Sequence, residues 1–143
     1  MPKPTIRVVD LDSTISDDSW RHWLIDRSLP DTDPQKYYAY HIHCDGDLAI
    51  NRYIVDESPH DVVFVTARHE YVRQMTKDWL DSQGFKYKAL IMRADNDHTP
   101  SVELKRKVVE QFQVMFNIER AYDDRQDIVD MYHSLGIHGV LVR

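Results

Sequence analysis

The sequence predicts an α/β fold, in which a doubly wound, parallel sheet of about five strands carries helices on its faces. Short, continuously apolar segments rich in β-branched residues alternate with segments whose apolar residues recur at helical spacing. The apolar segments lack the alternation of a half-exposed strand, which is typical of parallel strands buried on both faces. Units of strand, helix and strand of this kind form right-handed crossovers.

Five segments are expected to form the strands. In chain order they are residues 5–10 (TIRVVD), 61–66 (DVVFVT), 87–92 (YKALIM), 118–123 (IERAYD) and 138–143 (HGVLVR). Three helices are expected between them, at residues 69–84, 100–116 and 125–136. Gly84 and Gly136 stand where helices commonly end, and Pro100 stands where a helix commonly starts.

The connection between the first two strands is unusually long. It takes roughly 45 residues, where a handful would be ordinary. Residues 30–35 (PDTDPQ) predict a loop, and helical stretches are expected on either side, near residues 18–27 and 46–55. We expect a small cap-like insertion, about residues 17–58, at the sheet edge of a single domain that spans residues 1–143. The three tryptophans are expected in the core; they are Trp20, Trp23 and Trp79.

Composition narrows the class of protein. The chain has 143 residues, of which 42% are hydrophobic and 29% charged, as in an ordinary globular domain. Its net charge of −6 disfavours a protein that coats nucleic acid, although a small anionic substrate is still compatible. The chain contains no apolar run long enough to cross a membrane and no secretory signal. Because Cys44 is the sole cysteine, no internal disulfide can form, and we expect a cytoplasmic protein.

Three of the predicted strands end in polar residues that could carry chemistry. Ligands of open α/β sheets bind outside the carboxyl ends of the strands, where such residues would meet. The residues at these ends are Asp10 and Asp12, then Thr66 and Arg68, and finally Asp123 and Asp124.

Converging carboxylates repel one another, so a cation is expected among them. Mg²⁺ prefers carboxylate and carbonyl oxygens and commonly pairs with phosphate. Lys105 lies on the predicted helix before the fourth strand, and with Thr66 and Arg68 it could hold a phosphoryl group. One aspartate could then act as a nucleophile and a second as an acid and base.

The insertion and the loop after the third strand supply further candidates. Arg21 and Arg93 could contact a substrate, and three rings could stack on a nucleobase, those of Tyr37, Tyr40 and His43. Residues 40–47 (YHIHCDGD) are rich in metal-binding side chains, but their spacing fits no standard zinc pattern. The sequence leaves open the roles of His41, His43 and Cys44.

The strand-end residues resemble the four motifs of the haloacid dehalogenase (HAD) superfamily. DLDST resembles the first motif, Asp-x-Asp-x-Thr; FVTAR resembles the second; Lys105 resembles the third, and YDDR the fourth. From FVTAR onward the chain also resembles the phosphatase domain of phage-type polynucleotide kinase/phosphatase, and it is similar to the 5′(3′)-deoxyribonucleotidases. The resemblance implies a HAD-like sheet in the strand order 5-4-1-2-3.

The resemblance also implies roles. Asp10 would be the nucleophile that forms an aspartyl-phosphate. Asp12 would be the acid and base, and Thr66 and Lys105 would be catalytic residues that bind the phosphoryl oxygens. The implied substrate-binding residues are Thr14, which would also position Asp12 and its loop, and Arg68; the candidates Arg21 and Arg93 are added to them from their places in the sequence. The implied Mg²⁺ ligands are Asp10, the backbone carbonyl of Asp12, Asp124 and Asp123, with the order of the last two left open.

The chain departs from these family patterns in three places. Ser13 stands where the first motif usually has glycine. Ser101 stands where the kinase/phosphatase pattern has an acidic residue, four positions before the lysine. The phosphate-binding loop of a kinase, Gly-x-x-x-x-Gly-Lys-[Ser/Thr], does not occur in the sequence.

We therefore expect a Mg²⁺-dependent phosphomonoesterase that acts on a nucleotide phosphate, with a deoxynucleoside monophosphate favoured. The alternative is a polynucleotide 3′-phosphatase that acts on DNA or RNA ends. A receiver-like phospho-acceptor domain is a further alternative, but receivers carry the acidic pair on the first strand and the acceptor later. The expected partner is the nucleotide or nucleic-acid end itself, with no membrane and no stable protein partner implied.

Overall fold

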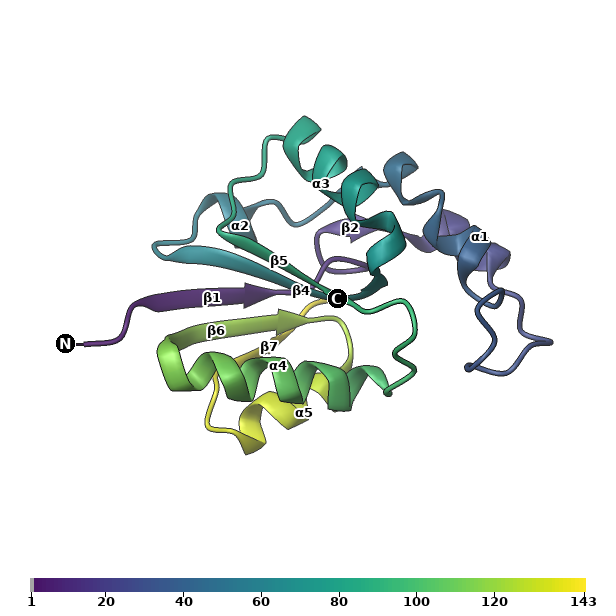
Figure 1. Ribbon diagram of the computed structural model, residues 1–143. Coiled ribbons are helices and arrows are strands. Elements are labelled where there is room, and N and C mark those ends of the chain that lie inside the picture. Colours follow the sequence, from purple (N-terminus) through teal and green to yellow (C-terminus); the bar gives the residue numbers. More distant parts are fainter. Residues whose placement is uncertain (1) are drawn as a thin grey trace.

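The fold is built on a five-stranded parallel sheet (Figure 1). In this computed structural model, which describes residues 2–143, the strand order is β5-β4-β1-β6-β7. The strands are β1 (Thr5–Val9), β4 (Asp61–His69), β5 (Ala89–Arg93), β6 (Asn117–Asp123) and β7 (Gly139–Leu141). All of the pairings between them are parallel. Read from the other edge, this order is 5-4-1-2-3 of the expected strands, so the α/β prediction is confirmed.

Helices cover both faces of this sheet (Figure 1). Helix α3 (Arg73–Ser82) lies on one face, and α4 (Ser101–Met115) and α5 (Gln126–Ser134) lie on the other. Neighbouring residues of a strand point to opposite faces, so Val9 packs in the core under α3 while Val8 packs in the core under α4 and α5. Among residues 2–143, the structure contains no helix with the length and apolar character that a membrane crossing requires.

Strand β4 continues to His69, past its predicted end at Thr66. The extension is held by β5, because His69 pairs with Arg93. The helix predicted from residue 69 consequently begins later, with the 3-10 turn η3 (Glu70–Val72) followed by α3. Arg68 and His69 therefore belong to the extended carboxyl end of a central strand.

The segment between β1 and β4 is less helical than predicted. It contains β2 (Ser16–Asp17), η1 (Ser19–Leu24), α1 (Tyr38–His41), η2 (Cys44–Gly46), β3 (Leu48–Ala49) and α2 (Tyr53–Asp56). The helix expected near residues 18–27 is the short 3-10 helix η1. The helix expected near residues 46–55 is wrong for its first part, which contains β3, and only α2 is helical there. Strands β2 and β3 pair antiparallel as a second, two-stranded sheet. Elements of two residues are too short for an apolar period to reveal them.

The part of the inserted segment with β2 and α1 lies beyond the carboxyl ends of the strands, next to α3, whereas α2 returns over the sheet, where Arg7 of β1 donates to the carbonyl of Ile54 (Figure 1). The indole Nε1 of Trp79 on α3 donates a hydrogen bond to the carbonyl of Asp47, 2.8 Å away, and ties the two parts together. Trp79 is buried as expected, whereas Trp20 and Trp23 are 47% and 77% exposed, so the core prediction is wrong for these two. The reason is that η1 turns Arg21 inward in their place.

Candidate active site

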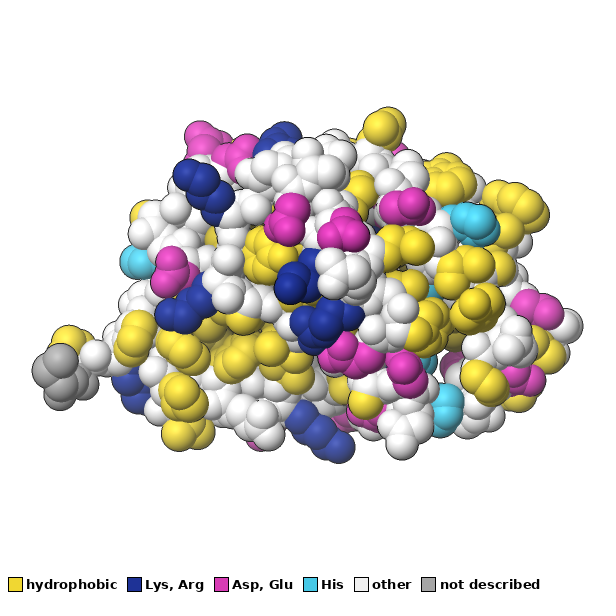
Figure 2. Space-filling view, turned by 45° about the horizontal axis from the view of Figure 1, so that its top comes forward, with side chains coloured by type: hydrophobic (Ala, Val, Ile, Leu, Met, Phe, Trp, Pro, Cys, Tyr) yellow, Lys and Arg dark blue, Asp and Glu magenta, His cyan; other side chains and the backbone are white. Residues whose placement is uncertain are grey.

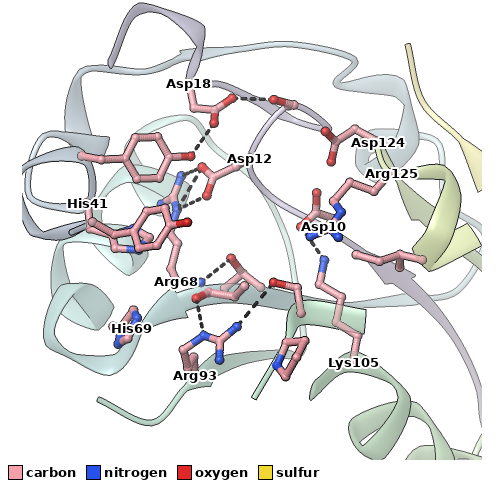
Figure 3. A pocket seen from close by; sticks show the side chains of 18 of the residues that line it. Asp10, Asp12, Asp18, His41, Arg68, His69, Arg93, Lys105, Asp124 and Arg125 are labelled. Atoms are coloured by element: carbon pink, nitrogen blue, oxygen red, sulfur yellow. Dashed lines mark hydrogen bonds and ion pairs between the residues drawn. The ribbon is translucent and has the colours of Figure 1, made fainter. Parts of the chain in front are cut away.

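A cavity of about 480 Å³ opens at the carboxyl ends of β1, β4 and β6, between the sheet and the inserted segment (Figure 3). Most of the residues that the sequence predicted for the site line it. They are Asp10, Asp12, Thr66, Arg68, Arg93, Lys105, Asp123 and Asp124. The other two predicted residues, Thr14 and Arg21, are fully buried and are not among its lining residues.

Lys105 connects the ends of β1 and β6. Its Nζ donates to Asp10 Oδ1 over 2.8 Å and to Asp123 Oδ2 over 2.6 Å. The lysine comes from α4, which packs against the sheet so that this long side chain reaches the strand ends. Burial alone would lower the pKa of Lys105, but the carboxylates of Asp10 and Asp123 raise it above its usual value. Lys105 is therefore a permanent cation in contact with Asp10.

The same corner holds more negative charge than one lysine neutralises. Asp10, Asp123 and Asp124 each place a carboxylate oxygen within 4.8 Å of the others. Burial and then the charge of Asp123 raise the pKa of Asp10 well above its usual range, although Lys105 opposes this effect. Burial and Asp123 also raise the pKa of Asp124. Three oxygen donors at this spacing fit a hard divalent cation, whose charge would relieve their repulsion.

Asp12 faces two arginines. Arg68 Nη2 and Arg21 Nη2 each donate to Asp12 Oδ1 over 2.7 Å, and Arg68 Nε adds a second contact at 3.1 Å. Burial would raise the pKa of Asp12, but Arg68 and then Arg21 hold it below its usual range. Asp12 is therefore an ionised carboxylate that reaches into the cavity from a cationic wall.

Behind that wall lies Asp47, which the sequence analysis missed as a site residue. Its buried carboxylate accepts from Arg21 Nε and Nη2, each over 2.8 Å, and from Arg68 Nη2 at 3.4 Å. The Ser16 hydroxyl and the Trp20 indole also donate to it. Asp47 lies far from all four motifs in sequence, so no local pattern could have assigned it to the site.

The remaining predicted residues occupy distinct places. Thr14 donates its hydroxyl to Asp10 Oδ2 over 3.0 Å. Thr66 lines the cavity, and its Oγ1 accepts from the backbone N–H of Arg68 at 3.1 Å. Arg93 also lines it, but its guanidinium donates to the carbonyls of residues 67, 97 and 99 and, at 3.4 Å, to the hydroxyl of Ser101. In this geometry Arg93 holds the loop before α4.

The loop after β1 bends sharply at Ser13, whose φ of 64° lies in the left-handed region where glycine is favoured. The hydroxyl of Ser13 donates to Asp18 Oδ1 over 2.6 Å, and Asp18 also accepts from Tyr40. The serine that replaces the usual glycine therefore links the loop bearing Asp12 to helix α1 of the inserted segment.

The inserted segment supplies an aromatic side to the cavity. Tyr37, Tyr40 and His41 line it because one turn of helix brings them to the same face. His69, at the end of β4, lines it as well. The candidate His43 is exposed and is not among the lining residues, so its prediction as a cavity residue is wrong. The histidine of this segment that lines the cavity is His41.

The run of metal-binding residue types at 40–47 does not gather around one point. Within residues 2–143, the group of three or more such side chains close enough to share an ion is Asp10, Asp123 and Asp124. Cys44 and Asp47 are buried separately, and Asp47 is occupied by the arginines.

The chain is similar to a known protein family. Residues 4–143 match the model of a family described as the polynucleotide kinase PNKP phosphatase domain. No curated protein matches the chain.

Solved structures give the same fold. A chain of a Pnkp1/Rnl/Hen1 complex is 26% identical, with a TM-score of 0.74 over 98% of this chain and 46% of that chain. A chain of the Pnkp1/Rnl/Hen1 RNA repair complex is 23% identical, with a TM-score of 0.72 over 98% of this chain and 42% of that chain. A hydrolase from Streptococcus pneumoniae TIGR4 is 10% identical, with a TM-score of 0.57 over 100% of this chain and 94% of that chain. The chain thus spans less than half the length of the two matched chains from these complexes.

Proposed function

The chain belongs to the family of polynucleotide kinase PNKP phosphatase domains, of the HAD type, and we propose that it is a Mg²⁺-dependent phosphomonoesterase that removes the phosphate from 3′ ends of polynucleotides. The single observation that carries this proposal is the contact of Lys105 with Asp10 and Asp123 beside Asp124. It combines a carboxylate nucleophile with a fixed cation and a set of donors for a divalent ion.

Asp10 is the nucleophile in this proposal. One of its carboxylate oxygens attacks phosphorus, and the bond between phosphorus and the 3′ oxygen of the nucleotide breaks, leaving an aspartyl-phosphate. Thr14 and Lys105 hold Asp10 in orientation through hydrogen bonds of 3.0 and 2.8 Å. Lys105 is also placed to neutralise negative charge that develops on the phosphoryl oxygens.

Asp12 is the general acid and general base in this proposal. It gives a proton to the departing 3′ oxygen and then accepts one from the water that hydrolyses the aspartyl-phosphate. The arginines favour its ionised form, which suits the second step. For the first step we propose that Arg68 turns from Asp12 toward the incoming phosphoryl group, which would let Asp12 hold a proton.

The acidic corner fits Mg²⁺, with Asp10, Asp123 and Asp124 as side-chain ligands and the carbonyl of Asp12 as a backbone ligand. When bound, Mg²⁺ supplies charge neutralisation at the phosphoryl oxygens.

The other predicted residues divide into two groups. We propose that Thr66, Arg68 and Arg93 face the substrate, since they line the cavity. Arg21 acts through Asp12, because its buried guanidinium is held between Asp12 and Asp47. We further propose that residues 1–143 form one domain, with residues 17–58 as a small cap over the strand ends.

A deoxynucleoside monophosphate is the second candidate substrate. The net charge of −6 favours it, because an acidic protein gains little from contact with a long phosphate backbone. The experiment that separates the candidates is a phosphate-release panel with 5′- and 3′-mononucleotides and 3′-phosphorylated oligonucleotides. We expect the highest kcat/KM for the oligonucleotides. Equal or better hydrolysis of a mononucleotide would favour the second candidate, and no release from any of them would refute the proposed function.

A further inference from the structure

Four aromatic rings run from the cavity to the molecular surface. His41 and His69 line the cavity, and their ring centroids are 5.4 Å apart. Tyr71 stacks on His69 at 5.3 Å with an interplanar angle of 28°, and Tyr38 lies 5.6 Å from Tyr71. We name these four residues the aromatic strip. Because it begins at the cavity wall, a ligand whose phosphate lies near Asp10 could extend along it.

The outer half of the strip is not a protein core. Tyr38 is 45% exposed and Tyr71 is 40% exposed. Figure 2 shows hydrophobic, histidine and acidic side chains toward the right of the view, where Figure 1 places the inserted segment, while lysines and arginines lie toward the centre and left, where further hydrophobic side chains also lie. The outer half of the strip therefore offers two exposed phenol rings at the surface.

The inner half of the strip carries unused polar atoms. The Nδ1 atoms of His41 and His69 are shielded from solvent and have no hydrogen-bond partner among residues 2–143. Buried polar atoms are almost always paired in native proteins, so two unpaired ones on adjacent rings are unusual, and the two imidazoles meet the cavity with their rings. Burial also lowers the pKa of both imidazoles, which keeps them neutral and suited to stacking.

The charge of the protein limits how else it could hold a polynucleotide. Affinity from backbone phosphates requires clusters of lysine and arginine, whereas the net charge is −6. Stacking on aromatic side chains supplies affinity for single strands without such clusters, and it tolerates any base sequence.

We infer that the aromatic strip is a stacking site for the bases next to the phosphorylated end of a single-stranded polynucleotide. The inference rests on the proposed function, because it requires a nucleotide phosphate in the cavity. It adds the recognition element that would favour a polynucleotide over a mononucleotide. It also predicts that affinity comes more from stacking on the bases than from salt-dependent contacts with the phosphates.

The first test is kinetic. It compares kcat/KM for a 3′-phosphorylated single-stranded hexanucleotide with kcat/KM for p-nitrophenyl phosphate, a small ester whose single ring is too short to reach Tyr38 and Tyr71 from the cavity. In the double variant Tyr38→Ala/Tyr71→Ala, the ratio of the two should fall by about fivefold to 50-fold, the effect of losing stacking on one base or more. Tyr71→Phe, which keeps the ring, should retain the ratio. Tyr53→Ala is the matched control, because Tyr53 is an exposed tyrosine on α2, outside the aromatic strip.

The second test measures binding without turnover. The Kd of the same oligonucleotide is determined by fluorescence anisotropy in chelator, at 50 and 200 mM salt. We expect a change of no more than about threefold with salt, equivalent to roughly one phosphate contact, and weaker binding by the double variant at both salt concentrations. A tenfold or larger loss with salt, or unchanged binding by the double variant, would overturn the inference.

The outcomes separate the two proposals. If the wild type hydrolyses p-nitrophenyl phosphate and the oligonucleotide, but the double variant keeps the wild-type ratio, the strip has no recognition role and the phosphatase proposal stands. If the wild type releases phosphate from neither, the proposed function fails, and the anisotropy measurement still decides whether the strip binds a single strand.

Discussion

Lys105 Nζ lies 2.8 Å from Asp10 Oδ1, so a buried cation from helix α4 contacts the carboxylate that directly follows the first strand. The contact explains how two aspartates one residue apart can stand at the end of a buried strand. Asp10 is matched by Lys105, and Asp12 is matched by Arg68 and Arg21. The two carboxylates therefore contact different cations, which suits the different roles proposed for them.

Lys105→Ala should lower kcat/KM for p-nitrophenyl phosphate by about 10² to 10³, because the variant loses a preorganised charge where negative charge develops. Arg68→Ala should have a smaller effect, since Arg68 reaches the substrate only by leaving Asp12. Lys107→Ala is the control, because this exposed lysine lies on the same helix. An unchanged rate for Lys105→Ala would show that another group fills its role.

Mg²⁺ should stabilise the folded protein, because the ligand set exists only there. At a concentration about 100 times its Kd, the melting temperature should rise by about 5 to 10 °C. In Asp124→Asn, which removes one charged donor, the rise should be at least halved at the same concentration. Asp130→Asn should behave as the wild type, since Asp130 is exposed and outside the acidic corner. Equal shifts in all three proteins would place the ion elsewhere.

Asp47→Asn should lower the free energy of unfolding by about 3 to 5 kcal/mol, because it leaves buried arginine charge without its partner. Asp56→Asn is the comparison. Its pair with Arg52 is 39% to 44% exposed, so its removal should change stability by less than about 1 kcal/mol. Urea denaturation of both variants measures the difference. Similar effects of the two substitutions would mean that Asp47 does not hold the arginines in place.

His41 should make the fold less stable in mild acid. Burial lowers its pKa from 6.5 to about 3, so between these values the unfolded chain binds the proton and the folded one does not. Stability therefore falls as pH decreases through 6.5. Between pH 7.5 and 5.5 the wild type should lose about 1.4 kcal/mol more than His41→Phe does.

The control for this pH series is His138→Phe, at an exposed position. It should keep the pH dependence of the wild type. If His41→Phe loses as much stability as the wild type between the two pH values, His41 is protonated in the fold and the description of the cavity wall is wrong.

The sequence predicted the sheet and the strand-end residues because both depend on local signals. Asp10 follows an apolar strand directly, and parallel strands bring their carboxyl ends to one edge. Lys105 could be predicted because the apolar period of its helix is clear and because it resembles the lysine of the third motif.

The inserted segment could not be predicted in the same way. Its elements are two to six residues long, so one shift of register decides whether His41 or His43 faces the cavity. Asp47 belongs to the site only because the irregular segment around it folds back onto Arg21 and Arg68, and no sequence pattern predicts that path. Trp23 is apolar by composition, yet it is exposed because a buried arginine two positions earlier takes the inward side of η1.

The most direct test of the proposed chemistry is phosphate release from a 3′-phosphorylated oligonucleotide by the wild type and by Asp10→Asn, in Mg²⁺ and in chelator. The amide is a poor nucleophile and a weaker metal ligand, so the variant should show no release above background. The wild type should be active in Mg²⁺, inactive in chelator, and active again when Mg²⁺ is restored. Release by Asp10→Asn at a rate close to that of the wild type would contradict the aspartyl-phosphate mechanism, and full wild-type activity in chelator would contradict the role of the acidic corner.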